Sequence, residues 1–212
     1  MVPRHEKKQV SMKSILEFGM IYDWYQNLVG VDGYRRLLVG SYIRPFPGQR
    51  VLDIGCGTAE LLDYLPEVDY VGLDHNPDYI RRAQQRFGQR GRFHLGGISA
   101  DDPHLRQGVD VALALGVLHH LDDATASDLL TLAHDRLRPG GRLITVDPCV
   151  IPGQSRWARF MVLNDRGRHV RDHQGYLALM RKHFPDASHD IRHDVLRIPF
   201  TELFMVGERA SE

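Results

Sequence analysis

Short apolar runs alternate with helical patterns from residue 50 onward. Each run has four to seven residues and is rich in Val, Leu and Ile, which is typical of strands buried on both faces. The predicted strands are 50–54, 70–73, 91–95, 109–115 and 142–146. Strand, helix and strand repeated in this way predict a parallel sheet that is covered by helices on both faces.

The helical patterns between these runs carry start and stop signals. The clearest stripe has apolar residues at spacings of three and four, namely Ala126, Leu129, Leu130, Ala133 and Leu137. Asp122 or Asp123 is expected to cap its start, and the sequence RPGG (138–141) is expected to end it. Asn76 followed by Pro77 predicts a second helix start, because the Asn side chain accepts from free amides and proline needs no donor there.

The two ends of the chain depart from this alternation. After residue 148 we expect a helix at 172–183 and strands at 191–196 and 200–206. Only RIP (197–199) separates these strands, so they should pair as an antiparallel hairpin at the end of the sheet. The first 49 residues are predicted to be helical, and RPFPGQ (44–49) breaks the chain before the first strand.

These elements predict one α/β domain with a Rossmann-like, doubly wound, mostly parallel seven-stranded sheet and an antiparallel C-terminal strand. Its expected parts are an N-terminal helical lid (1–49), a ligand-binding core (50–148) and a specificity insert with the terminal hairpin (149–212).

Composition narrows the possible functions. Lys plus Arg and Asp plus Glu both number 27, so a net charge of zero makes a nucleic-acid partner unlikely. Cys56 and Cys149 are too few for a disulfide framework and fit no zinc-site spacing, which favours packing roles in a reducing cytoplasm. His169 and His173 lack the glutamate of an HExxH motif, so no metal is expected. The sequence contains no run of about 18 apolar residues, so no membrane span is predicted.

A glycine loop follows the first strand, in the sequence VLDIGCGTAELL (51–62). Gly55 and Gly57 allow a ligand to approach the main chain, but a dinucleotide loop needs a third glycine where this chain has Glu60. Asp53 is expected at the mouth of the loop, where its charge would disfavour a pyrophosphate. The loop therefore favours a ligand with positive charge, such as S-adenosylmethionine.

A second carboxylate supports a nucleoside ligand. Asp74 closes the second strand, 21 residues after Asp53, and is expected beside it at the carboxyl edge of the sheet. A carboxylate there can accept both hydroxyls of a ribose, in NAD as well as in S-adenosylmethionine. An NAD-dependent oxidoreductase and a non-catalytic S-adenosylmethionine-binding module therefore both stand as alternatives.

Four segments resemble, in order and spacing, the core motifs of class I S-adenosylmethionine-dependent methyltransferases. They are VLDIGCGTAELL, VGLDHNP, VALALGVLHHLDD and LRPGGRLITVDP, and the resemblance covers about 50–148. It implies methyl transfer to an oxygen, nitrogen or carbon of a small-molecule acceptor.

The same resemblance implies a cofactor site. Asp53, Gly55 and Gly57 would surround the methionine moiety, Asp74 would hold the ribose and His75 would flank the adenine. Cys56, inside the loop, and Leu115, at the end of the fourth strand, are also expected to contact the cofactor. Relatives often have an acidic residue after the third strand, where this chain has Gly97, so adenine would meet the backbone at Gly97 and Ile98 or the acid Asp101. Tyr22 in the lid would hydrogen bond to the methionine part.

Residues for the acceptor are expected beyond the cofactor loop. His119 and His120 follow the fourth strand and are candidates for accepting a proton, or alternatively for ordering the loop and contacting the cofactor. Five arginines lie between positions 156 and 171. Within that stretch Arg168 and His169 are candidates for binding a carboxylate or phosphate of the acceptor, against the alternative of a solvated surface.

Overall fold

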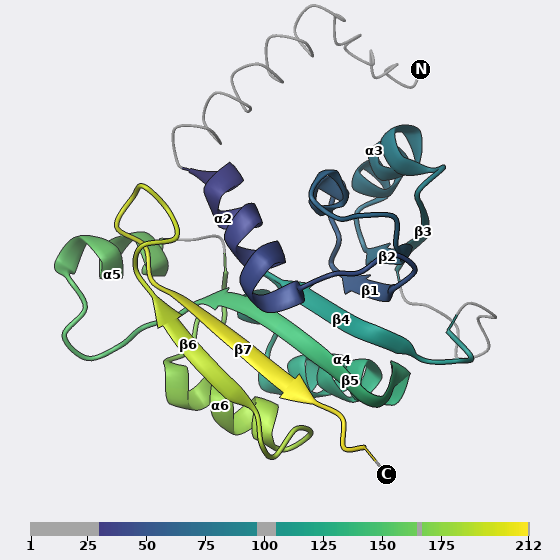
Figure 1. Ribbon diagram of the computed structural model, residues 1–212. Coiled ribbons are helices and arrows are strands. Elements are labelled where there is room, and N and C mark those ends of the chain that lie inside the picture. The colour runs from purple at the N-terminus through teal and green to yellow at the C-terminus, as the bar shows by residue number, and fades with distance from the viewer. Residues whose placement is uncertain (1–29, 97–104, 165–166, 212) are drawn as a thin grey trace, which may run out of the picture.

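A single twisted sheet organises the computed structural model, which describes residues 30–96, 105–164 and 167–211 (Figure 1). Within these ranges the strand order is β3-β2-β1-β4-β5-β7-β6. The strands are β1 (Arg50–Ile54), β2 (Asp69–Asp74), β3 (Gly91–Leu95), β4 (Val109–Leu115), β5 (Leu137–Pro148), β6 (Ser188–Arg192) and β7 (Glu202–Glu208). Strands β1 to β5 pair in parallel, and β7 runs antiparallel to both β5 and β6. The predicted fold class is confirmed.

Helices cover both faces of the sheet (Figure 1). They are α2 (Val31–Leu37), which continues into the π-helix η1 (Leu38–Ile43), then α3 (Pro77–Phe87), α4 (Asp123–Arg136), α5 (Arg156–Leu163) and α6 (His173–Arg181). Short 3-10 turns are η2 (Glu60–Asp63) and η3 (Leu118–His120). Side chains of η1 and α3 pack on one face, and those of α4 and α6 pack on the other. Alternate residues of β1 and β4 therefore enter two separate apolar cores.

The predicted helix starts are confirmed in detail. The Asn76 side chain accepts from the amides of Asp78 (2.9 Å) and Tyr79 (3.4 Å) at the start of α3. Asp122 rather than Asp123 is the N-cap of α4, and it accepts from the amide of Thr125 at 2.9 Å. Each cap satisfies amides that the first turn of a helix leaves without internal partners.

Helix α4 ends just before RPGG, as predicted, but the strand that follows does not begin at the predicted residue 142. Strand β5 begins directly after α4, where Leu137 pairs with Val109, and the register then shifts so that Arg142 pairs with Val111. Residues 138–141 are thus a bulge inside the strand. A Cβ on Gly141 would lie 2.9 Å from the carbonyl oxygen of Val109, so this close approach requires glycine.

The terminal hairpin exists, but its predicted bounds are wrong. Residues 193–201, rather than the three residues RIP, connect β6 to β7. Strand β6 is a polar, largely exposed edge strand, which an apolar pattern does not reveal. Val195, assigned to a strand from its hydrophobicity, is instead buried in the connecting loop, where it joins the core on the α2 side. Helix α5, capped by Ser155, was also not predicted.

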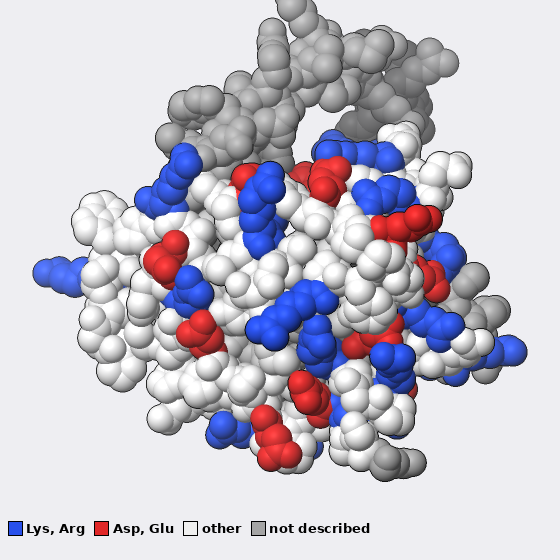
Figure 2. All heavy atoms as spheres, in the orientation of Figure 1, with Lys and Arg blue, Asp and Glu red and all other residues white. Residues whose placement is uncertain are grey.

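The predicted N-terminal lid falls mainly on residues 1–29, outside the described residues, and it stays a prediction together with the role of Tyr22. Its described continuation, α2, is tied to the glycine loop by an ion pair between Arg35 and Glu60. Figure 2 shows basic and acidic side chains interspersed over the face that it presents, in keeping with the net charge of zero. No described helix is long and apolar enough to cross a membrane.

Candidate functional site

The glycine loop lies at the carboxyl ends of β1 and β2, and its two glycines serve different purposes. Both have left-handed backbones, with φ of 79° at Gly55 and 57° at Gly57. A Cβ on Gly55 would lie 2.5 Å from a methyl group of Val117, whereas one on Gly57 would meet no described atom within 4 Å. Gly55 is therefore required by packing against the segment after β4, and the described residues leave room beside Gly57 in which a ligand can approach.

The amide groups of this loop are already used inside the protein. The amides of Gly55 and Cys56 donate to the carbonyl of Leu73, at 2.8 and 2.9 Å, and the amide of Gly57 donates to Oδ2 of Asp74 at 2.9 Å. Loops that bind pyrophosphate direct such amides at the phosphate oxygens. These three consecutive amides are turned toward β2 instead, which disfavours a diphosphate ligand.

Asp53 lies beneath the loop rather than at its open mouth. It is only 3% exposed, and its Oδ2 accepts a hydrogen bond of 2.6 Å from the hydroxyl of Tyr70. Burial raises the pKa of Asp53 to about 6, and the nearby charge of Asp74 also raises it, while the bond from Tyr70 lowers it. A cationic group above the loop would stabilise the charged form of this carboxylate.

Tyr70 is a site residue that sequence reasoning missed. In the β1–β2 register Tyr70 pairs with Val51, and Gly72 pairs with Asp53, so Tyr70 reaches the carboxylate diagonally. A Cβ on Gly72 would lie 2.7 Å from Sγ of Cys56, so the missing side chain makes room for the loop. No local motif signals this arrangement, because it depends on how two strands align.

The other predicted cofactor residues surround the same edge of the sheet. Asp74 is half-buried and also accepts from the amide of Asn76 at 2.8 Å, which holds its carboxylate beside the loop. His75 is exposed next to it, and Leu115 is half-buried at the end of β4. Burial raises the pKa of the Cys56 thiol, as befits a packing residue. Gly97, Ile98 and Asp101 lie outside the described residues.

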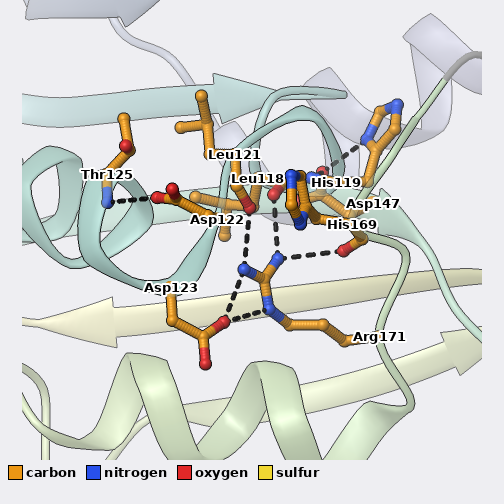
Figure 3. Close-up of polar contacts among 9 residues, drawn as sticks. All are labelled: Leu118, His119, Leu121, Asp122, Asp123, Thr125, Asp147, His169 and Arg171. Atoms are coloured by element: carbon orange, nitrogen blue, oxygen red, sulfur yellow. Dashed lines mark hydrogen bonds and ion pairs between the residues drawn. The ribbon is translucent and has the colours of Figure 1, made fainter.

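The two candidate histidines occupy different environments at the end of β4. His119 is 4% exposed, and its Nδ1 lies 2.8 Å from Oδ1 of Asp147, which also accepts from the His119 amide at 3.1 Å (Figure 3). His120 is exposed, and its ring centroid lies 4.0 Å from that of His119. Asp147 was not singled out from the sequence, although its place near the end of β5 puts it at the same edge as the end of β4.

Arg171 belongs to the chain's own framework and not to an acceptor site. Figure 3 shows its guanidinium between the segment after β4 and the segment that leads to α6. It donates to the carbonyls of Leu118 (2.9 Å), Leu121 (2.7 Å) and His169 (3.0 Å) and to Oδ1 of Asp123 (2.7 and 2.9 Å). These contacts of Arg171 with Leu118, Leu121, Asp123 and His169 form the Arg171 clamp. Arg168 and His169 have exposed side chains beside it, and the His169 amide donates to the His119 carbonyl at 2.9 Å.

The fold and this edge of the sheet are those of a Rossmann-like domain, and comparisons with known proteins show what its core is similar to. Residues 52–143 match the family described as a methyltransferase domain. The "O-methyltransferase resE" of Aspergillus sclerotiorum is 32% identical over 132 residues, which cover 58% of this chain and 49% of that protein. The matched core of the chain is thus similar to S-adenosylmethionine-dependent methyltransferases, the family that its sequence motifs also resemble.

Solved structures agree on the fold. The S-adenosylmethionine-dependent methyltransferase SibL in its apo form matches with a TM-score of 0.68 at 20% identity, over 95% of this chain and 60% of that one. The [4+2]-cyclase SpnF matches with a TM-score of 0.64 at 13% identity, over 84% and 81%. The chain spans about half the length of the curated relatives that it matches.

Proposed function

We propose that this chain transfers the methyl group of S-adenosylmethionine to a small-molecule acceptor. One observation carries this function: the described residues leave room beside Gly57, while the amides of residues 55–57 are bound to β2 and two carboxylates lie under and beside the loop. The methyltransferase family match over the same residues supports it. A donor that carries an ammonium and a sulfonium suits these charges, and a diphosphate does not.

The residues present fit this cofactor. Asp74, held by two amides, retains lone pairs that can accept ribose hydroxyls, and His75 lies exposed beside it for the adenine. Asp53 supplies negative charge below the methionine moiety. When bound, the cofactor supplies both the electrophilic methyl group and its leaving group. The protein then has to align the acceptor, which contributes about 7 to 11 kcal/mol in favourable cases.

We further propose a hydroxyl as the accepting group. The name of the Aspergillus relative specifies an O-methyltransferase. A hydroxyl arrives protonated, so a base near the carboxyl end of β4 is useful, and the histidines at 119 and 120 stand there. Arg168 and His169, exposed beside the Arg171 clamp, are positioned to meet an anionic group of the acceptor.

The free thiols of Cys56 and Cys149 fit a reducing cytoplasm.

A second candidate is a domain that binds S-adenosylmethionine without methylating anything. The similarity to a structure whose name is that of a [4+2]-cyclase supports this second candidate, because a protein with the same fold is named there for an activity other than methyl transfer. Cofactor binding alone does not separate these two functions.

Two experiments separate the possibilities. Calorimetry should detect binding of S-adenosylmethionine and S-adenosylhomocysteine, weakened at least tenfold in Asp74→Ala, and no binding of NAD. Binding of NAD alone would overturn the proposed cofactor. A screen of phenols, catechols, carboxylates and amines with methyl-labelled cofactor should show transfer to a hydroxyl compound. Cofactor binding with no labelled product from any class would favour the non-catalytic module.

A further inference from the structure

The contact between Asp147 and His119 ties together two strands at the edge where the proposed acceptor must arrive. Asp147 is 1% exposed near the end of β5, and His119 is 4% exposed in η3 after β4. Oδ1 of Asp147 accepts hydrogen bonds from both the ring Nδ1 and the backbone amide of His119. One carboxylate oxygen therefore fixes the backbone and the ring of the same residue, and it selects the tautomer with the proton on Nδ1.

The His119 ring is also enclosed by main chain on two sides. A Cβ on Gly116 would lie 3.7 Å from its Cε1, and a Cβ on Gly167 would overlap its Cδ2. The carbonyl of His119 accepts from the amide of His169, and Arg171 binds the carbonyl of Leu118 just before it. These contacts leave the ring little freedom to turn toward an acceptor.

The same short segment contacts the cofactor loop. Val117, two residues before His119, fills the space over Gly55 that a side chain would occupy. His120 follows His119, is exposed, and has its ring tilted 40° against the His119 ring at 4.0 Å. Fixing His119 thus fixes where His120 stands relative to the glycine loop.

Other titratable groups face this pair from the surrounding elements. Burial is the main cause that raises the pKa values of Tyr34 on α2, Tyr176 on α6 and Cys149 after β5. The charge of Asp147 adds to the rise in all three, and that of Glu202 on β7 adds to it for Tyr34 and Cys149. The carboxylate of Asp147 therefore lies near two tyrosines and one thiol that stay neutral, of which it shares Tyr34 and Cys149 with a second acid, Glu202, and its Oδ2 accepts no hydrogen bond within the described structure. The carboxylate hydrogen bonds to His119 and also to the backbone of Leu118, the residue before it.

We propose that Asp147 and His119 are positioning residues, which hold the segment after β4 so that His120 meets the acceptor and takes its proton. This inference rests on the proposed methyl transfer. In that step the acceptor oxygen forms the new bond to the methyl carbon, the bond from carbon to sulfur breaks, and the hydroxyl proton passes to His120. His119 keeps its proton on Nδ1 and takes no part in the transfer.

Paired substitutions test this division of roles. An Asn amide nitrogen stands about where His Nδ1 does, so His119→Asn retains the donor to Asp147 without a titratable ring, and His119→Gln does not. We expect His119→Asn to keep kcat within about threefold of the wild type. His119→Gln and Asp147→Ala should lower kcat at least tenfold with an unchanged KM for the cofactor. His120→Asn should lower kcat by roughly 10²-fold or more, the size of a lost general base.

His189→Asn is the matched control, because His189 also stacks on another histidine, His173, in a different part of the described structure. It should leave kcat unchanged. If His119→Asn loses as much activity as His119→Gln while His120→Asn stays active, His119 is itself the base and the proposal is overturned. Equal activity in all His119 and Asp147 variants would also overturn it.

A measurement independent of activity addresses the pair directly. Nitrogen-15 imidazole NMR should show His119 as the Nδ1-protonated tautomer in the wild type, with this signature lost in Asp147→Ala. A His119 ring protonated on Nε2 alone would refute the positioning role. A wild-type chain that binds cofactor but methylates nothing would refute the proposed function and the role of His120, while the spectrum would still decide the Asp147–His119 pair.

Discussion

The hydroxyl of Tyr70 donates a hydrogen bond of 2.6 Å to the carboxylate of Asp53, inside the sheet and beneath the glycine loop. Tyr70 is 1% exposed and Asp53 is 3% exposed, so water does not replace this bond if it is lost. The negative charge that the proposed cofactor needs is therefore held in place by a phenol from the neighbouring strand.

Removing this hydroxyl with Tyr70→Phe should weaken cofactor binding and stability together. The bond lowers the pKa of Asp53, so its loss should move that pKa further up and leave less carboxylate charged near neutral pH. An unpartnered buried acceptor also destabilises the fold by about 1 to 3 kcal/mol. Denaturant unfolding and calorimetry at pH 7 measure both effects. Unchanged affinity with unchanged stability would contradict the prediction.

Asp53→Asn should change how stability depends on pH. Burial raises the folded-state pKa of Asp53 from its usual 3.8 to about 6, so the folded protein binds this proton more tightly than the unfolded chain. The wild type should therefore lose stability, by up to about 3 kcal/mol, as pH rises from about 4 to about 6. The Asn variant should lack this component, so the difference between the two unfolding curves isolates it. A constant difference across that pH range would count against the assignment.

Wild-type affinity for a cationic cofactor should fall as pH decreases through about 6, because protonation removes the charge of Asp53. Calorimetry with S-adenosylmethionine between pH 5 and pH 8 in Asp53→Asn should show a weaker affinity without that dependence. An identical pH dependence in both proteins would assign it to another group.

The two glycines of the loop should respond differently to alanine. Gly55→Ala places a methyl group 2.5 Å from Val117 on a left-handed backbone, so it should destabilise the fold by roughly 2 kcal/mol or more. Val117→Ala in the same chain should restore part of that loss. Gly57→Ala meets no described atom within 4 Å, so it should cost about 1 kcal/mol of backbone strain and mainly reduce cofactor affinity. Thermal unfolding and calorimetry distinguish the two outcomes.

Arg171→Ala should destabilise the fold, whereas Arg168→Ala should not. The first change leaves the carbonyls of Leu118 and Leu121 without their guanidinium donor, which we expect to cost about 2 to 4 kcal/mol and lower Tm by several degrees. Arg168 has an exposed side chain, so its removal should move Tm little and affect only the KM for an anionic acceptor. Equal Tm values for both variants would show that the clamp contributes nothing measurable.

The sequence was most informative where burial is continuous. The predicted bounds of β1, β3 and β4 are those observed, and β2 is longer by one residue at each end. Strands buried on both faces need apolar side chains on both, so their sequences are runs of consecutive apolar residues. The polar edge strand β6 and the bulge in β5 escaped prediction because pairing with neighbouring strands, and not local hydrophobicity, forms them.

The candidate site, too, was predictable from the sequence only in part. Gly55, Gly57 and Asp74 could be proposed from one loop and one strand end, since each lies in a recognisable local pattern. The partners of the site residues could not. Tyr70 with Asp53, Asp147 with His119 and Arg171 with Leu118 join residues 17, 28 and 53 positions apart, through strand register and loop packing.

The place of β7 between β5 and β6 constrains how the molecule is assembled during translation. Strand β6 leaves the ribosome before the strand that lies between it and the rest of the sheet. Until β7 emerges, the outer backbone of β5 and all of β6 have no partner in the described sheet, and exposed edges of this kind invite pairing with other chains. The nascent protein therefore passes through a stage in which its core helices can already pack while one border of the sheet is still open to aggregation.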